Sequence, residues 1–275
     1  MAASSQVHAK QPPQKASVAP AAPKFTLAVP AAASDLTNTK SVEYEDAQLE
    51  AIMKQFVASH SDHEWSISLQ GLGSDERAAA YDPSAVFRSA SMFKLLLMYP
   101  LIQRTPIDQW PSVDLDVNGK TKTLDACVQA MLKVSDNSCG KAVGDYVGWA
   151  YADAQLKMLG LQRTTLNDDS GPKTTAGDVA FYLQGLYEGK WFDGATRAYI
   201  VKTLDQQILR AGIPTGCGSA CAVADKTGDL GFVRHDAGVI RYAGGAYVLS
   251  VFSDGASYSQ IADLADQLQT FMAAN

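Results

Sequence analysis

The sequence predicts an α/β (α+β) fold, in which an antiparallel sheet of about five strands is flanked by the N- and C-terminal helices and holds an inserted all-helical subdomain. Apolar side chains recur at helical spacing near both ends of the chain, and strand-like segments lie just inside each of these helices. The middle of the chain, roughly residues 91–209, has mainly helical periodicity. This order of elements suits a single sheet whose strands come from both ends of the chain, with the helical segment inserted between them.

The first predicted element of the folded part is an amphipathic helix between Val42 and His60. Its apolar positions follow the pattern of one buried helix face, at Leu49, Ile52, Met53, Phe56 and Val57. Residues 64–72 then alternate apolar and polar side chains, as a half-buried strand does. Three further strands and a closing helix are predicted at Ala222–Lys226, Ala237–Tyr242, Ala246–Phe252 and Tyr258–Ala274.

The composition is that of a globular protein without a basic surface field. Of the 275 residues, 47% are hydrophobic and 19% are charged, which is enough apolar surface for a large core. The formal net charge is −6, so we expect no nucleic-acid partner, because phosphate binding requires clustered Lys and Arg. The chain contains no apolar run long enough to span a bilayer as a helix.

Residues 1–40 differ in composition from the folded domain that we expect over residues 41–275. Five of the 11 prolines fall in this Ala- and Pro-rich stretch, which predicts a disordered tether. Its start, residues 1–5, lacks the basic and apolar regions of an intact signal peptide. We expect an exported domain, secreted or anchored at the cell surface, with the tether leading toward a membrane or the cell wall. The alternative is an ordinary disordered terminus of a cytosolic protein.

The four cysteines form two close pairs, and this spacing favours an oxidising compartment. Cys127 and Cys139 are 12 residues apart, and Cys217 and Cys221 are four apart. We expect a disulfide within each pair, although four cysteines allow three connectivities. A zinc site is the rival interpretation, but only one pair has suitable spacing and no histidine lies near it. Free buried thiols are the third possibility. We expect neither a metal nor a cofactor.

Ser91 and Lys94 predict a nucleophile next to a base. They lie on one helix face, one turn apart, directly before the apolar run Leu95–Met98. Burial against this run would lower the pKa of the lysine, and a neutral amine can accept the hydroxyl proton. The S-x-x-K pattern is weak by itself, because the chain contains three copies, at Ser91/Lys94, Ser138/Lys141 and Ser170/Lys173.

Two further motifs, each present once, distinguish the first copy. Ser135-Asp136-Asn137 and Lys226-Thr227-Gly228 follow it at long separations that only folding can close. Taken individually, the former could be a helix cap and the latter a strand end at a turn. The three motifs together resemble those of the penicillin-recognising serine hydrolases, namely class A β-lactamases and penicillin-binding proteins. The resemblance extends over residues 41–275.

The resemblance implies a role for each motif residue. Ser91 would be the acylated nucleophile, Lys94 its proton acceptor and Ser135 the proton relay, with Lys226 beside it. Backbone N–H groups of Ser91 and Asp229 would form the oxyanion hole. The residues that would bind substrate are Asn137, Asn167, Thr227, Gly228, Asp229 and Arg234.

One position departs from the class A pattern. Class A β-lactamases carry a glutamate four residues before the Ω-loop asparagine, here Asn167, and this sequence has Arg163 there. Asp168 and Asp169 follow the asparagine and are the nearest acidic substitutes. We therefore expect a monomeric serine hydrolase acylated at Ser91 by β-lactams or D-Ala-D-Ala-like peptides, with slow deacylation. The alternatives are a genuine class A β-lactamase with a rearranged deacylating-water site, or a non-hydrolysing β-lactam or cell-wall binding module.

Overall fold

The computed structural model describes residues 46–275. The predicted tether over residues 1–40, and the first residues of the predicted N-terminal helix, lie outside this range. In the described part, the helix α1 covers Ala47–Ser59 and begins at Asp46, whose side chain accepts hydrogen bonds from Gln48 N and Leu49 N.

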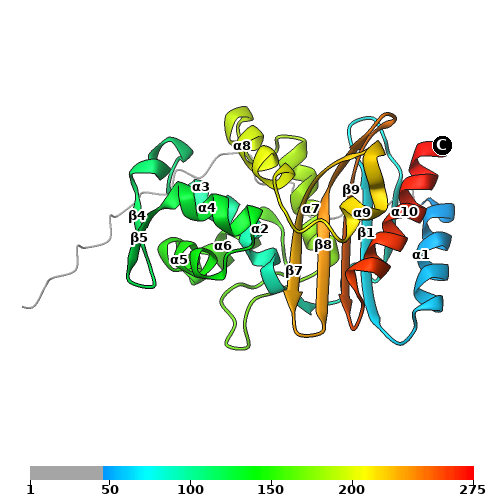
Figure 1. The fold of residues 1–275 in the computed structure, drawn as a ribbon, viewed down its shortest axis with the longest axis horizontal. Helices are drawn as coiled ribbons and strands as arrows, with labels where there is room; N and C mark the ends of the chain where they lie inside the picture. Colours follow the sequence, from blue (N-terminus) through cyan, green and yellow to red (C-terminus); the bar gives the residue numbers. More distant parts are fainter. Residues whose placement is uncertain (1–45) are drawn as a thin grey trace, which may run out of the picture. The chain divides into compact units, whose positions relative to one another are not determined.

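A five-stranded antiparallel sheet forms the centre of the fold, as predicted (Figure 1). Its strands stand in the order β2-β1-β9-β8-β7, so the N-terminal and C-terminal parts of the described chain meet where β1 pairs with β9. Among residues 46–275, strand β7 forms one edge of the sheet and pairs with β8 alone. The strands are β1 (Glu64–Gly71), β2 (Ala78–Tyr81), β7 (Ala222–Leu230), β8 (Val233–Tyr242) and β9 (Gly245–Asp254).

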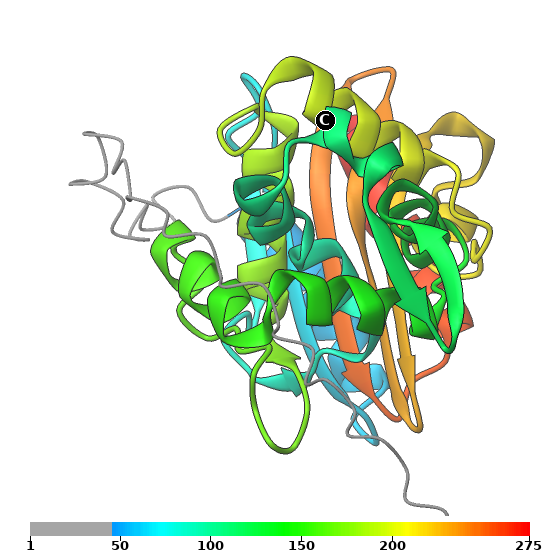
Figure 2. The ribbon, with the colours of Figure 1, turned by 90° about the vertical axis from the view of Figure 1, so that its left-hand side faces the viewer.

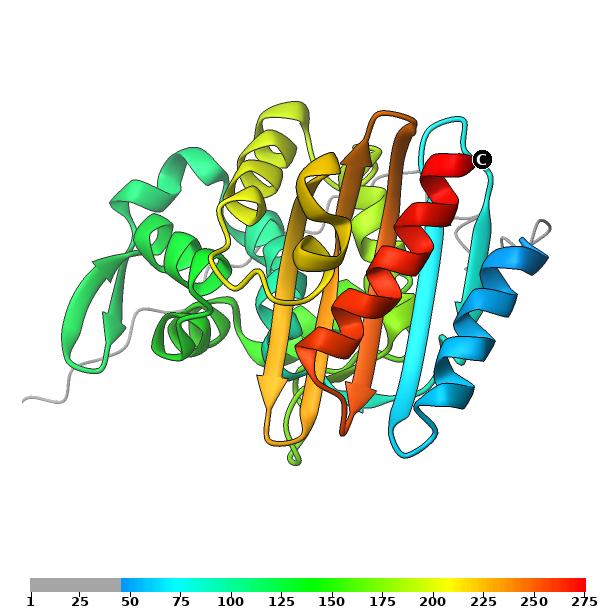
Figure 3. The same ribbon diagram turned by 45° about the vertical axis from the view of Figure 1, so that its right-hand side comes forward.

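Helices α1 and α10 (Tyr258–Ala274) cover one face of the sheet (Figure 3). The start of α10 is set by a capping box in which Ser257 and Gln260 exchange hydrogen bonds. Buried side chains from both helices and this sheet face form one apolar cluster, which includes Leu49, Met53, Leu264 and Leu268. Helix α9 (Ile213–Cys217) lies against α10 and leads into β7.

The opposite face of the sheet packs on α7 (Ala176–Tyr187) and, beyond it, on the inserted subdomain (Figure 2). A second and larger apolar cluster lies here, and it includes the whole apolar run Leu95–Met98. The remaining helices of this part are α2 (Phe93–Leu96), α3 (Met98–Arg104), α4 (Leu124–Lys133), α5 (Asn137–Val147), α6 (Trp149–Leu159) and α8 (Gly194–Asp205).

The insertion is mainly helical but not all-helical as predicted. It contains a hairpin of β4 (Asp114–Val117) and β5 (Lys120–Thr123). Asn118 and Gly119 form its turn, both with positive φ (55° and 77°), the conformation that Asn-Gly adopts in two-residue hairpins. A second short pair joins β3 (Phe87–Arg88), which precedes Ser91, to β6 (Lys173–Thr174).

Both predicted disulfides are present. Cys127–Cys139 joins α4 to α5, with 4.8 Å between the two Cα atoms. Cys217–Cys221 joins the last residue of α9 to the residue before β7, with a Cα separation of 5.8 Å. Because the first bridge closes the segment that carries Ser135, it restrains one of the three motifs directly.

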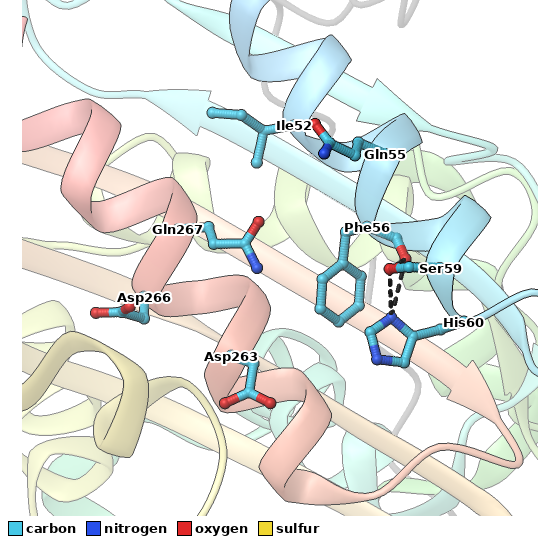
Figure 4. Close-up of a pocket in the computed structure, with 8 residues that line it drawn as sticks. All are labelled: Ile52, Gln55, Phe56, Ser59, His60, Asp263, Asp266 and Gln267. Atoms are coloured by element: carbon cyan, nitrogen blue, oxygen red, sulfur yellow. Dashed lines mark hydrogen bonds between the residues drawn. The ribbon is translucent and has the colours of Figure 1, made fainter.

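A surface groove of about 500 Å³ lies between α1 and α10 (Figure 4). Its walls come from α1, the C-cap residue His60 and α10, and they include Phe56, Asp263 and Asp266. None of the predicted catalytic or substrate-binding residues lines it. Across residues 46–275, no helix combines the length and apolar character that a membrane crossing requires.

Candidate active site

The nucleophile motif lies at the open edge of β7, where the short 3-10 helix Ala90–Met92 meets the strand. Gly228 permits this approach, since a Cβ atom there would lie 3.2 Å from the Cβ of Ala90. Two bonds hold the chain before Ser91: Ser89 N donates to Pro172 O (2.8 Å), and His235 Nε2 donates to Arg88 O (2.9 Å). Ala90 adopts a positive φ of 46°, so Ser91 follows a strained backbone position.

Lys94 is fully buried, and its amine contacts two of the three motifs. Nζ lies 3.0 Å from Ser91 Oγ, 2.7 Å from Asn137 Oδ1, and 2.5 and 3.3 Å from the carbonyl oxygen and the hydroxyl of Ser135. A neutral amine has two N–H donors and one lone pair. The two shortest contacts are to carbonyl oxygens, which can only accept. In the neutral form the lone pair is therefore left to the two hydroxyl groups, of which that of Ser91 is the nearer.

Burial makes the neutral form of Lys94 more accessible than it is for an exposed lysine. Burial lowers the pKa of its amine to about 8, while the charge of Asp136 acts in the opposite direction. Asp136 does not reach the amine, because its carboxylate caps α5 by accepting from Cys139 N (2.7 Å). The helix-cap interpretation of this motif is thus correct for Asp136, while its two neighbours face Lys94.

Ser135 connects the two buried lysines. Its hydroxyl lies 3.0 Å from Lys226 Nζ on β7 and 3.3 Å from Lys94 Nζ on α2. Ser135 adopts a positive φ of 57° in the short segment between α4 and α5. This conformation is costly for a residue with a Cβ atom, so the surrounding bonds and the neighbouring disulfide hold the hydroxyl in place.

Lys226 is buried as completely as Lys94. Burial lowers its pKa to about 7, and the charge of Lys94 acts in the same direction, whereas Asp225 and Asp236 raise it. Its amine also donates to Thr227 O (2.7 Å). Two amines of lowered pKa therefore flank one hydroxyl group, which is an arrangement suited to moving protons rather than to a simple ion pair.

A buried acidic cluster that the sequence analysis missed lies behind Lys226. Asp225 accepts from Arg210 Nη1 (2.5 Å) and from Gln207 Nε2, and the carboxyl of Asp236 accepts from Ile213 N (2.8 Å). Burial raises the pKa of both carboxyl groups, that of Asp236 to about 7. An aspartate directly before the motif lysine, inside an apolar strand, was the available signal for this cluster.

The outer edge of β7 carries backbone groups that face away from the sheet. Thr227 N donates to Gln207 Oε1 (3.2 Å), so it points outward rather than toward β8. Alternate residues of a strand direct their N–H groups to the same side, so Asp229 N–H also points to the open edge. The side chain of Asp229 instead pairs with Arg234 across the strands (3.2 Å). Arg234 also donates to Gly231 O (2.7 Å), which directs it to the β7–β8 turn.

In the described part of the chain, no hydrogen bond joins Arg163, Asn167 or Asp168 to the cluster around Lys94 and Lys226. Asn167 is exposed, and its backbone N–H donates to Asp153. Arg163 is exposed as well, and its backbone N–H donates to Asp178 (3.0 Å). Asp168 accepts from Ser170, which lowers the pKa of its carboxyl to about 2, and it pairs with Lys173. Within residues 46–275, no hydrogen bond joins Asp168 to Ser91, and so low a pKa makes it a weak base.

The other two S-x-x-K copies do not place amine and hydroxyl together in any hydrogen bond of the described chain. Lys141 pairs with Asp145 (2.5 Å), and Ser138 accepts from Asn118 (2.9 Å). Lys173 is engaged by Asp168 (3.2 Å). Of the three serine–lysine pairs, Ser91 and Lys94 alone form a hydrogen bond within these residues.

The fold is similar to that of several solved structures. A protein named PBP-A superposes with a TM-score of 0.75 at 19% identity, covering 85% of this chain and 98% of that one. A variant of it, solved as an acyl-enzyme complex with penicillin G, gives the same score and identity over 85% and 99% of the two chains. An ancestral class A β-lactamase has a TM-score of 0.72 at 19% identity, over 82% and 99%. At 19% identity, this similarity shows a shared fold.

Comparison with protein families identifies the chain more directly. A search of curated protein sequences finds no significant match. The model of the beta-lactamase enzyme family, however, matches residues 47–271, which is nearly all of the described chain. The sequence resemblance, the sheet with its helical insertion and this match agree. The chain belongs to the beta-lactamase enzyme family and is a serine hydrolase with a class A β-lactamase-like fold.

Proposed function

We propose that this protein is acylated at Ser91 by β-lactams or by peptides ending in D-Ala-D-Ala, and that it releases the acyl group slowly. The observation that carries the proposal is the geometry of Lys94, whose Nζ lies 3.0 Å from Ser91 Oγ while two carbonyl oxygens occupy its N–H donors. This is the arrangement that a serine nucleophile needs for activation by a neutral amine.

The contacts support a balanced acylation step. As Ser91 Oγ attacks the substrate carbonyl carbon, its proton passes to Lys94 Nζ, and the N–H groups of Ser91 and Asp229 stabilise the oxyanion. When the carbon–nitrogen bond breaks, the hydroxyl of Ser135 gives its proton to the leaving nitrogen. Lys94, which lies 3.3 Å from that hydroxyl, then returns the first proton to Ser135. Lys226, at 3.0 Å, favours the anionic character of Ser135 during this transfer.

The same proposal assigns the substrate contacts. Lys226 and Thr227 would bind the substrate carboxylate at the edge of β7, and Asn137 would bind the amide of its acyl side chain. Asn137 is exposed, while its Oδ1 is held by Lys94, so its amide nitrogen is oriented by that bond. Arg234 is a weaker candidate for the carboxylate, because its guanidinium is engaged by Asp229 and the β7–β8 turn.

Slow deacylation is proposed from the Ω-loop side of the site. Hydrolysis of the acyl ester needs a base that holds and deprotonates a water molecule. The position of the class A glutamate carries Arg163, and the carboxylate of Asp168 is held by Ser170 and Lys173. The two disulfides support an exported protein, because such bridges persist in oxidising compartments.

The test is covalent labelling by benzylpenicillin. We expect one ligand mass on the peptide that contains Ser91, and none in Ser91→Ala. Lys94→Ala should slow labelling by about 10²- to 10⁴-fold, the usual contribution of a positioned base. Lys141→Ala is the matched control, since this lysine belongs to the second S-x-x-K copy and should leave the rate unchanged. Labelling at Ser138 or Ser170 would contradict the assignment.

Deacylation is tested separately with a chromogenic cephalosporin. We expect a burst of one equivalent followed by slow turnover, because acylation has all of its groups and deacylation lacks its base. Turnover at hundreds per second without a burst, on the order expected for an efficient hydrolase, would favour a genuine β-lactamase with another water site. An acyl-enzyme that never turns over would favour a binding module.

A further inference from the structure

Gln207 lies beside the substrate edge of β7 although it belongs to no motif. It is buried, with 3% of its surface exposed, just after α8. Its backbone N–H donates to Leu204 O (3.0 Å), and the next residue, Ile208, donates to Lys133 O at the end of α4 (3.0 Å). Gln207 is thereby fixed between the segment that carries Ser135 and the edge strand.

The side chain of Gln207 bridges the buried acid to the motif on β7. Its Nε2 donates to Asp225, while its Oε1 accepts from Thr227 N (3.2 Å) and Thr227 Oγ1 (3.1 Å). Lys226 Nζ lies 3.5 Å from the same oxygen. The reversed amide would set its NH₂ group against the N–H of Thr227 and its oxygen against a carboxylate, so only one orientation satisfies all of the groups.

This orientation decides where the hydroxyl proton of Thr227 points. A hydroxyl has one proton, and Gln207 Oε1 carries none, so the proton of Thr227 is donated to Gln207. Substrate recognition as proposed above needs the same proton for the substrate carboxylate. Anion binding therefore breaks the hydroxyl bond to Gln207. The backbone N–H of Thr227 keeps its bond in both states and does not contribute to the difference.

We infer that Gln207 is a specificity-determining residue, which weakens the recognition of carboxylate-bearing substrates by competing for the Thr227 hydroxyl proton. The inference rests on the proposed function, in which Thr227 binds the substrate carboxylate. Gln207 itself touches neither Ser91 nor Lys94 in any hydrogen bond of the described chain. Its contact with Lys226 is the longest of its hydrogen bonds, at 3.5 Å. The effect of Gln207 should consequently fall mainly on the choice between charged and neutral substrates, and the acid-to-ester ratio cancels any effect on the acylation chemistry that both substrates share.

The experiment compares benzylpenicillin with its methyl ester, which lacks the charge. The second-order rate constant of acylation is measured for both, and their ratio is the readout. In Gln207→Met we expect the ratio of acid to ester to rise by about 2- to 12-fold, the range that corresponds to one neutral hydrogen bond. Gln206→Met is the matched control, because this neighbouring glutamine is exposed, and its ratio should equal that of the wild type.

The same comparison in a Thr227→Val variant separates competition for the hydroxyl proton from a purely structural role of Gln207. In Thr227→Val the contested proton is absent, so adding Gln207→Met should leave the ratio unchanged there. A ratio that falls or stays constant in Gln207→Met alone, or that rises equally in Thr227→Val, overturns the inference. Gln207→Asn, whose shorter side chain withdraws the oxygen but keeps a polar group, gives the same test if the methionine variant does not fold. A wild type that neither compound acylates overturns the proposed function instead, and with it the basis of the inference.

Discussion

Lys226 Nζ lies 3.0 Å from the hydroxyl of Ser135, although 91 residues separate the two in the chain. One residue belongs to the edge strand of the sheet, and the other to the helical insertion. This bond is therefore a direct measure of how the two parts of the domain are docked. Any change that shifts the insertion relative to β7 must also shift the proton relay that we propose.

The acylation rate is expected to rise with pH up to about 8. Lys94 can accept the proton of Ser91 only as a neutral amine, and burial lowers its pKa to about 8. Below that pH the neutral fraction, and with it the rate, falls by about tenfold per unit. The measurement is acylation by benzylpenicillin methyl ester, a neutral probe, so that the charge of Lys226, whose pKa burial lowers to about 7, acts only through Ser135 and not through substrate binding. A rate that does not change between about pH 6 and pH 8 would contradict a neutral Lys94 as the base.

Gly140→Ala should impair acylation from a position that contacts no substrate. A Cβ atom on this buried residue of α5 would lie 2.7 Å from Cε of Lys94, so the lysine side chain has to move. Because small displacements of a catalytic group are costly, we expect a loss of about 10-fold or more. Gly194→Ala is the control, since its Cβ would meet open space at the start of α8. Equal rates in both variants would show that Lys94 tolerates the shift.

The two disulfides should contribute unequally to stability. The Cys127–Cys139 bridge spans 12 residues and the Cys217–Cys221 bridge four. Removing the first by a double alanine substitution should lower the free energy of unfolding by about 3 kcal/mol, and removing the second by about 2 kcal/mol, on the loop-closure estimate. The first variant should also be acylated more slowly, because its loop holds Ser135 at positive φ. Urea unfolding and penicillin labelling measure the two effects, and an unchanged labelling rate would separate the bridge from the site.

Arg163→Glu should shorten the lifetime of the acyl-enzyme and leave its formation nearly unchanged. The substitution restores a carboxylate at the position that carries it in class A enzymes, and Arg163 is exposed, so the new side chain adds no buried charge. We expect deacylation to accelerate by up to about 10²-fold. Gln162→Glu, the exposed neighbour, controls for the added negative charge. An equal acceleration in both variants would attribute the effect to charge rather than to a positioned base.

The first and last elements of the described fold were predictable from the sequence, because helix caps and apolar periodicity coincide there with burial. The C-terminal helix was predicted to the residue, since Ser257 caps it just before an apolar face begins. The strands were predicted shorter than they are at β7 and β8, because their polar ends, such as Asp229 and Arg234, follow no apolar alternation. The dipeptide Asn118-Gly119 is typical of a two-residue hairpin turn. The hairpin was nevertheless missed, because the periodicity of residues 91–209 as a whole predicted helices.

The candidate site was predictable only in part. Its motif residues could be named because their order along the chain matches a family, yet their distances depend on packing that no motif encodes. Strand β2 is built largely from alanine, a poor strand former, and forms through its pairing with β1. Gln207 and Asp236 have ordinary local surroundings in the sequence. Their importance arises only when the α8–α9 segment closes over the edge of β7.

The packing of the α8–α9 segment over β7 also hinders strand pairing between two copies of the protein. An edge strand with free backbone groups is a template for pairing with a strand of another chain, and this is a common route to aggregation. Along β7, Arg210 covers the carbonyl of Val223, and Gln207 and Lys226 cover the N–H and carbonyl of Thr227. In the described chain, Asp229 and Leu230 at the end of the strand are exposed, as is Ala222 at its start. Conditions that detach the α8–α9 segment would therefore expose the unpaired backbone groups of this nine-residue edge strand. Another copy of the chain could then pair with the strand, and the protein would oligomerise.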